Sequence, residues 1–202
     1  MNVVVGRADS LQTPVFAHDL RYIIFRPFWH PPRSIIVNEI LPAMEQDSTY
    51  LDTHDMELCP SANDDVPALP MTPENMDRLR AGTARVRQRP GPNNTLGLVK
   101  FMFPNTHKVY LHDTTSRGAF SRTRRDASHG CVRVQNPAAL AAFVLRGEPG
   151  WTEQRIHDAM NGERTFHVDL TRRLPVWIVY LTAFADPDGT VRLPCPVRTA
   201  GA

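Results

Sequence analysis

The chain has 202 residues, of which 42% are hydrophobic and 22% charged, and it carries a formal net charge of +2 at pH 7. This composition is typical of a globular protein and excludes a disordered chain, and the length allows one domain with a sizeable core. The near balance of 23 basic and 21 acidic residues does not indicate nucleic-acid binding. No apolar run approaches the roughly eighteen residues that a membrane span needs.

The first residues and the cysteines bear on the cellular compartment. Residues 1–6 lack the basic region, apolar core and cleavage site of a signal peptide, which by itself indicates the cytoplasm. Cys59, Cys131 and Cys195 show no metal-binding spacing, so we expect neither a metal site nor a cofactor. An odd count leaves at least one thiol unpaired. A Cys59–Cys195 disulfide with Cys131 free would suit an oxidising compartment, although the sequence does not set the distance.

The first part of the chain predicts two strands and a helix. Residues 2–5 form a short apolar run ended by a glycine, and residues 20–25 are rich in β-branched and aromatic side chains, so both runs predict strands. Ser34 is a candidate N-cap, and Pro42 should kink or end the helix that follows. Apolar residues recur there at helical spacing: Ile35, Ile36, Ile40, Leu41 and Met44.

The segment 47–95 is polar and interrupted by prolines. A loop of this length inside one domain is usually functional or mobile. We interpret it as an insertion that could cap an active site, with a short helix around residues 72–79. A surface excursion without regular structure is the alternative.

The rest of the chain predicts a mostly β protein with added helices. Two β-rich runs flank a turn at residues 104–107 and indicate a hairpin, and residues 113–127 show no apolar period and indicate a loop. Two helices should follow, capped by Asn136 and Thr152. The hairpin strands are expected at 96–103 and 108–112, the helices at 136–145 and 153–160, and the final strands at 166–170 and 176–184.

Cys131 is the candidate catalytic residue. A free thiol has a pKa of about 8.5, so it needs a base to become a nucleophile at neutral pH. His112 ends a β-like run and could be that base, whereas the direction of His129 depends on the turn. Gly130 allows a sharp turn whose backbone N–H groups could face an oxyanion. A buried cysteine beside an ordinary turn is the alternative interpretation.

Residues 110–113, Tyr-Leu-His-Asp, and residues 128–133, Ser-His-Gly-Cys-Val-Arg, resemble the signature of the L,D-transpeptidase catalytic domain (YkuD type). Further segments resemble the large periplasmic branch that cross-links peptidoglycan: 3–7, 12–16, 87–92 and 97–105. The resemblance implies a β-sandwich catalytic domain over residues 1–202, with a substrate-capping insertion at 47–95. It also implies a periplasmic location and that the domain here lacks its first strands.

The resemblance implies a role for each signature residue. Cys131 would be the nucleophile and His112 the general base, oriented by the backbone carbonyl of Asp113. The Asp113 carboxylate is an alternative third member, although adjacent strand residues face opposite ways. The amides of Gly130 and Cys131 would bind the oxyanion, with the Tyr110 hydroxyl as a further donor. Tyr110 is otherwise a core residue.

Other residues near the cysteine are candidates for substrate binding. Arg133, Arg117 and Arg125 could bind the carboxylates of peptidoglycan stem peptides, since guanidinium groups pair well with carboxylates. A solvated loop face is the alternative for Arg117 and Arg125. Ser128 and His129 could contact substrate or simply hold the turn.

The resemblance implies a cysteine-dependent L,D-transpeptidase that forms a thioester, releases D-alanine and is inhibited by carbapenems. An L,D-carboxypeptidase and a catalytically weak peptidoglycan-binding remnant of the same fold are alternatives. A papain-type hydrolase does not fit, because its histidine lies well downstream of the cysteine and His112 lies upstream of Cys131.

Overall fold

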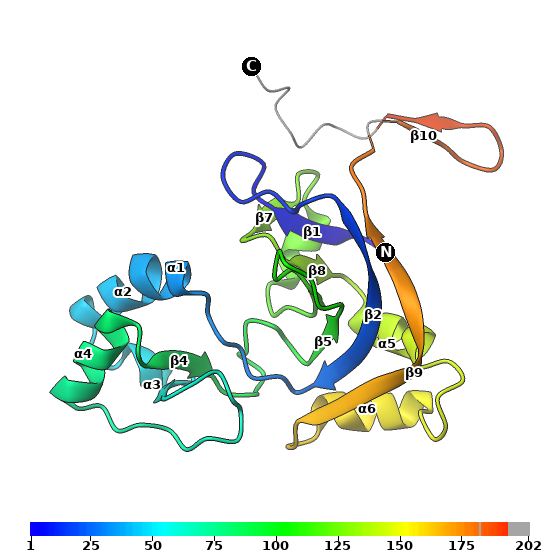
Figure 1. Ribbon diagram of the computed structural model, residues 1–202. Coiled ribbons are helices and arrows are strands. Elements are labelled where there is room, and N and C mark those ends of the chain that lie inside the picture. Colours follow the sequence, from blue (N-terminus) through cyan, green and yellow to red (C-terminus); the bar gives the residue numbers. More distant parts are fainter. Residues whose placement is uncertain (182, 194–202) are drawn as a thin grey trace.

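A seven-stranded sheet forms the body of the protein in the computed structural model, which describes residues 1–181 and 183–193 (Figure 1). Its strand order is β7-β1-β8-β6-β5-β2-β9. The strands are β1 Val3–Gly6, β2 Phe16–Phe25, β5 Val99–Met102, β6 Leu111–His112, β7 Asp126–Ser128, β8 Val132–Val134 and β9 Phe166–Ile178. The predicted fold class, mostly β with added helices, is confirmed.

The hairpin that delivers His112 is confirmed, since β5 and β6 pair antiparallel. Its second strand is shorter than predicted. Lys108 has a φ of 56°, which is incompatible with a strand. The Asn105 side chain closes the turn by donating to the carbonyls of Phe103 and Val109, both at 2.7 Å. These side-chain bonds replace strand pairing before residue 111.

The strands β2 and β9 are longer than the sequence indicates. The prediction began β2 at residue 20 and split β9 into two strands, and both details are wrong. Pro175 interrupts the sequence pattern, but β9 is an edge strand, where a residue without an N–H is tolerated. The predicted strand 176–184 ends at Ile178; beyond it, β10 Phe184–Ala185 pairs with β11 Val191–Arg192. Residue 182 lies outside the described residues.

Two helices contribute to the main core, α5 Pro137–Val144 and α6 Glu153–Asn161 (Figure 1). Both begin as predicted: the side chains of Asn136 and Thr152 each accept a backbone N–H as N-caps. Residues from the sheet and from both helices meet in this core: Leu20, Ile23, Phe25, Val99, Phe101, Phe103, Val134, Ala141, Leu145 and Ile156. These helices therefore occupy one face of the sheet.

A continuous helical segment covers residues 33–46 as α1 Arg33–Ile35, a π-helical turn η1 Ile36–Ile40 and α2 Leu41–Gln46. It begins one residue before Ser34, which is therefore not the N-cap. Pro42 does not end the helix, because it lies in the first turn of α2. The π turn just before it fits the loss of a backbone hydrogen bond that a proline causes.

The segment 47–95 is a folded unit and not the long loop that the sequence predicts. It contains α3 Tyr50–Thr53, α4 Pro73–Ala81 and a two-stranded sheet of β3 Met56–Cys59 with β4 Arg85–Gln88. Only the short helix was predicted. Together with α1 and α2 it lies to one side of the main sheet (Figure 1). It has a second core, built from residues that include Ile36, Ile40, Leu51, Leu58, Leu79 and Val86.

The sequence analysis missed the two strands of this unit for two reasons. Each is only four residues long, and β4 has a charged side chain, that of Arg87, in the interior. Arg87 is buried and forms an ion pair with Glu57 at 2.7 Å. It also donates to the backbone carbonyls of Asn63, Asp64 and Val66. Burying an arginine requires such a full set of partners, which no local pattern shows. Cys59 is buried in β3, and Cys195, its predicted disulfide partner, lies outside the described residues.

The separate core of this unit predicts that it loosens independently of the main sheet. Leu79→Ala should cost about 2–5 kcal/mol of stability, because it opens a cavity in the second core. Hydrogen exchange followed by mass spectrometry should show faster exchange in β3 and β4, with β2 and β5 still protected. Met71→Ala, at an exposed position, is the matched control. Equal loss of protection in both cores would contradict two separate cores.

Candidate active site

Strand register places the candidate residues in rows across one face of the sheet. β6 and β8 run parallel, with Leu111 opposite Val132 and His112 opposite Arg133. β5 runs antiparallel to β6, with Lys100 opposite His112. Residues directly opposite each other on neighbouring strands project from the same face. Lys100, His112 and Arg133 therefore form one row, with His112 in the middle.

Cys131 lies one step before β8, next to Tyr110 and on the face that carries His112. The Val132 amide donates to the Tyr110 carbonyl at 3.1 Å, which holds the two chains together at this point. The amide and hydroxyl of Tyr110 both act on the Cys131 sulfur in the direction that lowers the pKa of the thiol. The Tyr110 ring lies edge-on to the His112 ring, with centroids 5.7 Å apart. The structure thus brings together the predicted nucleophile, base and tyrosine.

The hydrogen bonds of His112 set which of its nitrogens can act as a base. Its side chain is buried, and Nδ1 lies 2.5 Å from the carbonyl oxygen of Asp113. A carbonyl only accepts, so Nδ1 carries the hydrogen and Nε2 has the free lone pair. Burial lowers the pKa of His112 to about 4, with contributions from Arg133 and Lys100, while the Asp113 carbonyl opposes the shift. The imidazole is therefore neutral at neutral pH.

The Asp113 side chain has a different role from its carbonyl. Its buried carboxylate accepts from the amides of Leu98 at 2.9 Å and Thr114 at 2.7 Å. It also pairs with Arg117. The carboxylate is fully occupied by these groups, and the carbonyl is what contacts His112. The alternative in which the carboxylate orients the histidine is not what the structure shows.

The candidate substrate-binding arginines differ in what they contact. Arg117 pairs with Asp113, and Arg125 donates to the carbonyl of Arg122 at 2.8 Å, so both guanidinium groups hold the loop itself. Arg133 projects from the face that carries Cys131, and the two groups interact electrostatically. Of these three arginines, the structure brings Arg133 to the thiol.

The turn before Cys131 is held by Ser128. The Ser128 hydroxyl donates to the Cys131 carbonyl at 2.5 Å and accepts from the Gly130 amide at 3.1 Å. Gly130 has a φ of 114°, which a residue with a side chain rarely adopts. Its amide is used inside the turn, unlike the oxyanion donor that the sequence predicts. The Cys131 amide is then the backbone candidate for that task.

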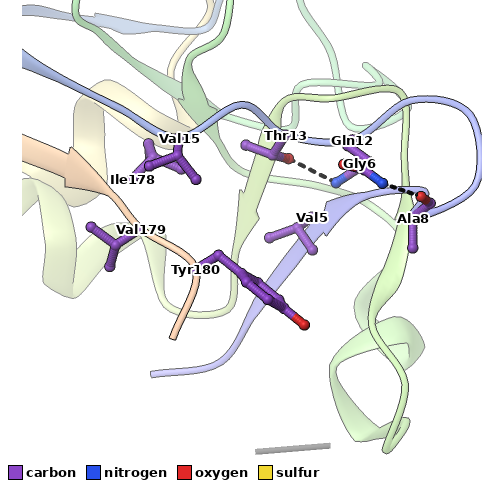
Figure 2. Close-up of a pocket in the computed structure, with 9 residues that line it drawn as sticks. All are labelled: Val5, Gly6, Ala8, Gln12, Thr13, Val15, Ile178, Val179 and Tyr180. Carbon is purple, nitrogen blue, oxygen red and sulfur yellow. Dashed lines mark hydrogen bonds between the residues drawn. The ribbon is translucent and has the colours of Figure 1, made fainter. Parts of the chain in front are cut away.

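A loop after β1 supports this turn from behind. The Thr13 hydroxyl donates to the Gly130 carbonyl at 2.8 Å. It also accepts from the Gly6 amide at 2.9 Å (Figure 2). A Cβ at Gly6 would lie 1.9 Å from the Leu11 carbonyl oxygen and 2.9 Å from the Gly130 Cα, so only glycine fits. Sequence reasoning missed Thr13. A cavity of about 90 Å³ lies beside it, lined by residues that include Val5, Val15, Ile178, Val179 and Tyr180 (Figure 2).

Residues 30–64 also reach the catalytic turn and its neighbourhood. His129 Nε2 lies 2.9 Å from a carboxylate oxygen of Glu39 in η1. His30 Nε2 lies 2.6 Å from Asp64, and Asp64 interacts electrostatically with Lys100 in β5. Sequence reasoning missed Glu39, Asp64 and Lys100, because these interactions join segments far apart in the chain. His129, predicted near the substrate, contacts this helical segment.

The thiol of Cys131 is protonated at rest. The thiol donates to the Lys108 carbonyl across 3.8 Å, and His112 is not a hydrogen-bond partner of the sulfur in the described part of the chain. Burial raises the pKa of Cys131, while the donors of Tyr110 and the charge of Arg133 act in the opposite direction. The site therefore holds a neutral thiol and a neutral imidazole on one face, and the two do not form an ion pair.

The protonation states predict the pH dependence of thiol alkylation. The rate of Cys131 alkylation by iodoacetamide should rise with pH through a pKa above the ordinary thiol value of about 8.5, since the thiolate is the reactive form. Tyr110→Phe removes a hydroxyl that lowers the pKa of Cys131 and should move this rise to higher pH. Mass mapping of the labelled peptide measures the rate at Cys131 alone. A plateau already present at pH 6 to 7 would instead indicate a thiolate–imidazolium pair.

Comparison with known proteins identifies the family of the chain. A family model described as the L,D-transpeptidase catalytic domain, YkuD, matches residues 1–156. A Haemophilus influenzae protein named "Putative L,D-transpeptidase" is 34% identical over 192 residues. That match covers 95% of this chain and 38% of the relative, so the chain spans about two fifths of the relative's length. The chain belongs to the YkuD family of L,D-transpeptidase catalytic domains.

Proposed function

We propose that the chain is a cysteine-dependent L,D-transpeptidase that cross-links peptidoglycan stem peptides through a thioester on Cys131. The observation that carries the proposal is the arrangement of Cys131, Tyr110 and His112 on one face, with His112 Nδ1 committed to the Asp113 carbonyl. This commitment leaves Nε2 as a base on the side of the ring that faces away from the backbone. The family's action on the cell wall suggests a periplasmic protein.

The first half-reaction transfers an acyl group to the cysteine. Rotation of the Cys131 side chain toward His112 lets Nε2 take the thiol proton as the sulfur attacks the carbonyl of the third residue of a tetrapeptide stem. The tetrahedral intermediate then collapses. The amide bond to the terminal D-alanine breaks, and the protonated His112 gives its proton to the departing amine. Free D-alanine and a thioester are the products.

The second half-reaction passes the acyl group to an acceptor. An amine from a neighbouring stem attacks the thioester, His112 takes a proton from that amine, and the cysteine leaves as a thiolate that recovers the proton. The new amide is the cross-link. Water in place of the amine gives L,D-carboxypeptidase activity by the same steps. A neutral imidazole at rest suits both halves, because it must accept a proton before it can donate one.

The oxyanion of each tetrahedral intermediate needs donors near the sulfur. The Cys131 amide and the Tyr110 hydroxyl are the candidates, since the Gly130 amide is bound to Ser128. The Tyr110 hydroxyl acts on the sulfur in the resting site, and it could donate to the oxyanion when the sulfur forms its new bond. Burial raises the pKa of Tyr110, so the hydroxyl keeps its proton throughout.

The segment 47–95 is proposed to cover the substrate. It packs in one core with α1, η1 and α2, and this assembly supplies Glu39 to His129 and Asp64 to the vicinity of Lys100. A catalytically weak binding remnant is the less favoured function, and the bond between His112 and the Asp113 carbonyl, on the face that carries Cys131, supports the active enzyme instead.

Loss of the nucleophile or the base should abolish turnover. Cys131→Ala and His112→Ala should each lower D-alanine release from disaccharide-tetrapeptides by at least about 100-fold, as expected for removal of a general base or nucleophile. Chromatography of the muropeptide products measures the release. Cys59→Ala and His157→Ala are the controls, because they remove a cysteine and a histidine outside the site. D-Alanine release by Cys131→Ala at the wild-type rate would overturn the proposal.

Carbapenem acylation should be confined to Cys131. A strained β-lactam carbonyl is attacked by the same thiol with the same base, so intact mass spectrometry should show a single adduct per chain. The adduct should persist when both other cysteines are replaced by alanine and disappear in Cys131→Ala. Label spread over all three cysteines would show that Cys131 is not specially activated.

A further inference from the structure

Two cations lie on either side of the proposed base. Lys100 on β5 and Arg133 on β8 are each directly paired with His112 on β6, and all three side chains project from the same face. Neighbouring strands are about 4.8 Å apart, so the two cationic positions lie about 10 Å apart at the backbone with His112 between them. Any anion that approaches the imidazole along this face meets both.

Neither cation has a carboxylate partner in the part of the chain that the structure describes. The ion pairs formed by residues 1–181 and 183–193 include neither Lys100 nor Arg133 within 4.0 Å of a carboxylate. Asp64 acts on Lys100 through space, but its own oxygen is held by His30 at 2.6 Å. In the described residues, neither cation is therefore in direct ion-pair contact with a carboxylate.

The partial burial of these cations distinguishes them from ordinary surface charges. Burial lowers the pKa of both Lys100 and Arg133, so each charge is held at a cost in free energy. A cation removed from water is retained where it gains a partner, and in the described residues neither cation has a carboxylate within 4.0 Å, with Asp64 acting on Lys100 only from a greater distance. A bound carboxylate would supply that partner. Lys100 is paired across the sheet with half-buried Ile24 on β2, so its backbone position in this row is fixed from both neighbouring strands.

We propose that Lys100 is a substrate-binding residue, and that Lys100 and Arg133 together select peptide acyl donors that carry two carboxylates near the scissile bond. This inference rests on the proposed function. A stem peptide offers the carboxylate of its terminal residue and, where the third residue is a diamino diacid, a side-chain carboxylate. Arg133, beside Cys131, would bind the carboxylate closer to the sulfur, and Lys100 the more distant one.

The first test uses small probes and does not depend on transpeptidase activity. Iodoacetate and iodoacetamide form the same bond with Cys131 but differ in charge, so their rate ratio reports the local preference for an anion. Lys100→Gln should lower the iodoacetate to iodoacetamide ratio by at least about threefold, and 0.5 M salt should reduce the difference. Lys100→Arg should retain most of the ratio. Arg21→Gln, an exposed cation on β2, should leave it unchanged.

The second test uses the peptide. KM for the tetrapeptide donor should rise about tenfold in Lys100→Gln, as for loss of one charge-assisted hydrogen bond. In Lys100→Gln, a donor whose side-chain carboxylate is amidated should have nearly the same KM as the unmodified donor. Melting temperatures of both Lys100 variants establish that they fold. An unchanged probe ratio and an unchanged KM in folded Lys100→Gln would overturn the inference. A ratio that falls in a protein inactive on tetrapeptides would support the carboxylate site and refute the proposed substrate.

Discussion

The parallel pairing of β6 with β8 is the interaction on which the site depends. It joins the strand that ends at His112 to the strand that begins just after Cys131, so two residues from separate segments share one face. A shift of one residue would turn Cys131 or His112 to the opposite side of the sheet. The Val132 amide bound to the Tyr110 carbonyl and the Ser128 hydroxyl bound to the Cys131 carbonyl keep the register and the turn in place.

The electrostatics of the site oppose charge separation before substrate binds. Burial lowers the pKa of His112 and raises that of Cys131, so both groups stay neutral. The direction of the His112 pKa shift also determines how the stability of the fold changes with pH. His112 has a folded pKa of about 4 and an unfolded pKa of about 6.5, so above pH 6.5 it does not change the free energy of unfolding with pH. As the pH falls from about 6.5 to 4, the unfolded chain binds the proton more readily, and the free energy of unfolding decreases progressively. The same burial that suits the chemistry therefore makes the site sensitive to acid.

The unit that includes the segment 47–95 shows how an irregular sequence can form a folded body. Its small sheet and short helices close around their own core, and buried Arg87 holds the intervening chain through three carbonyls. The unit touches the catalytic turn through Glu39 and His129, both of which are polar and partly exposed. Such a contact positions one body on another without merging their cores.

Local chemistry made parts of the protein predictable from sequence. Asn136 and Thr152 cap their helices, and Cys131 and His112 stand out, because caps and nucleophile turns depend on neighbours in the chain. The short strand β8, the small sheet and the place of Lys100 beside His112 were decided only by tertiary structure. Cross-strand register and buried ion pairs join residues distant in the chain, and their free energy appears only once the strands have paired.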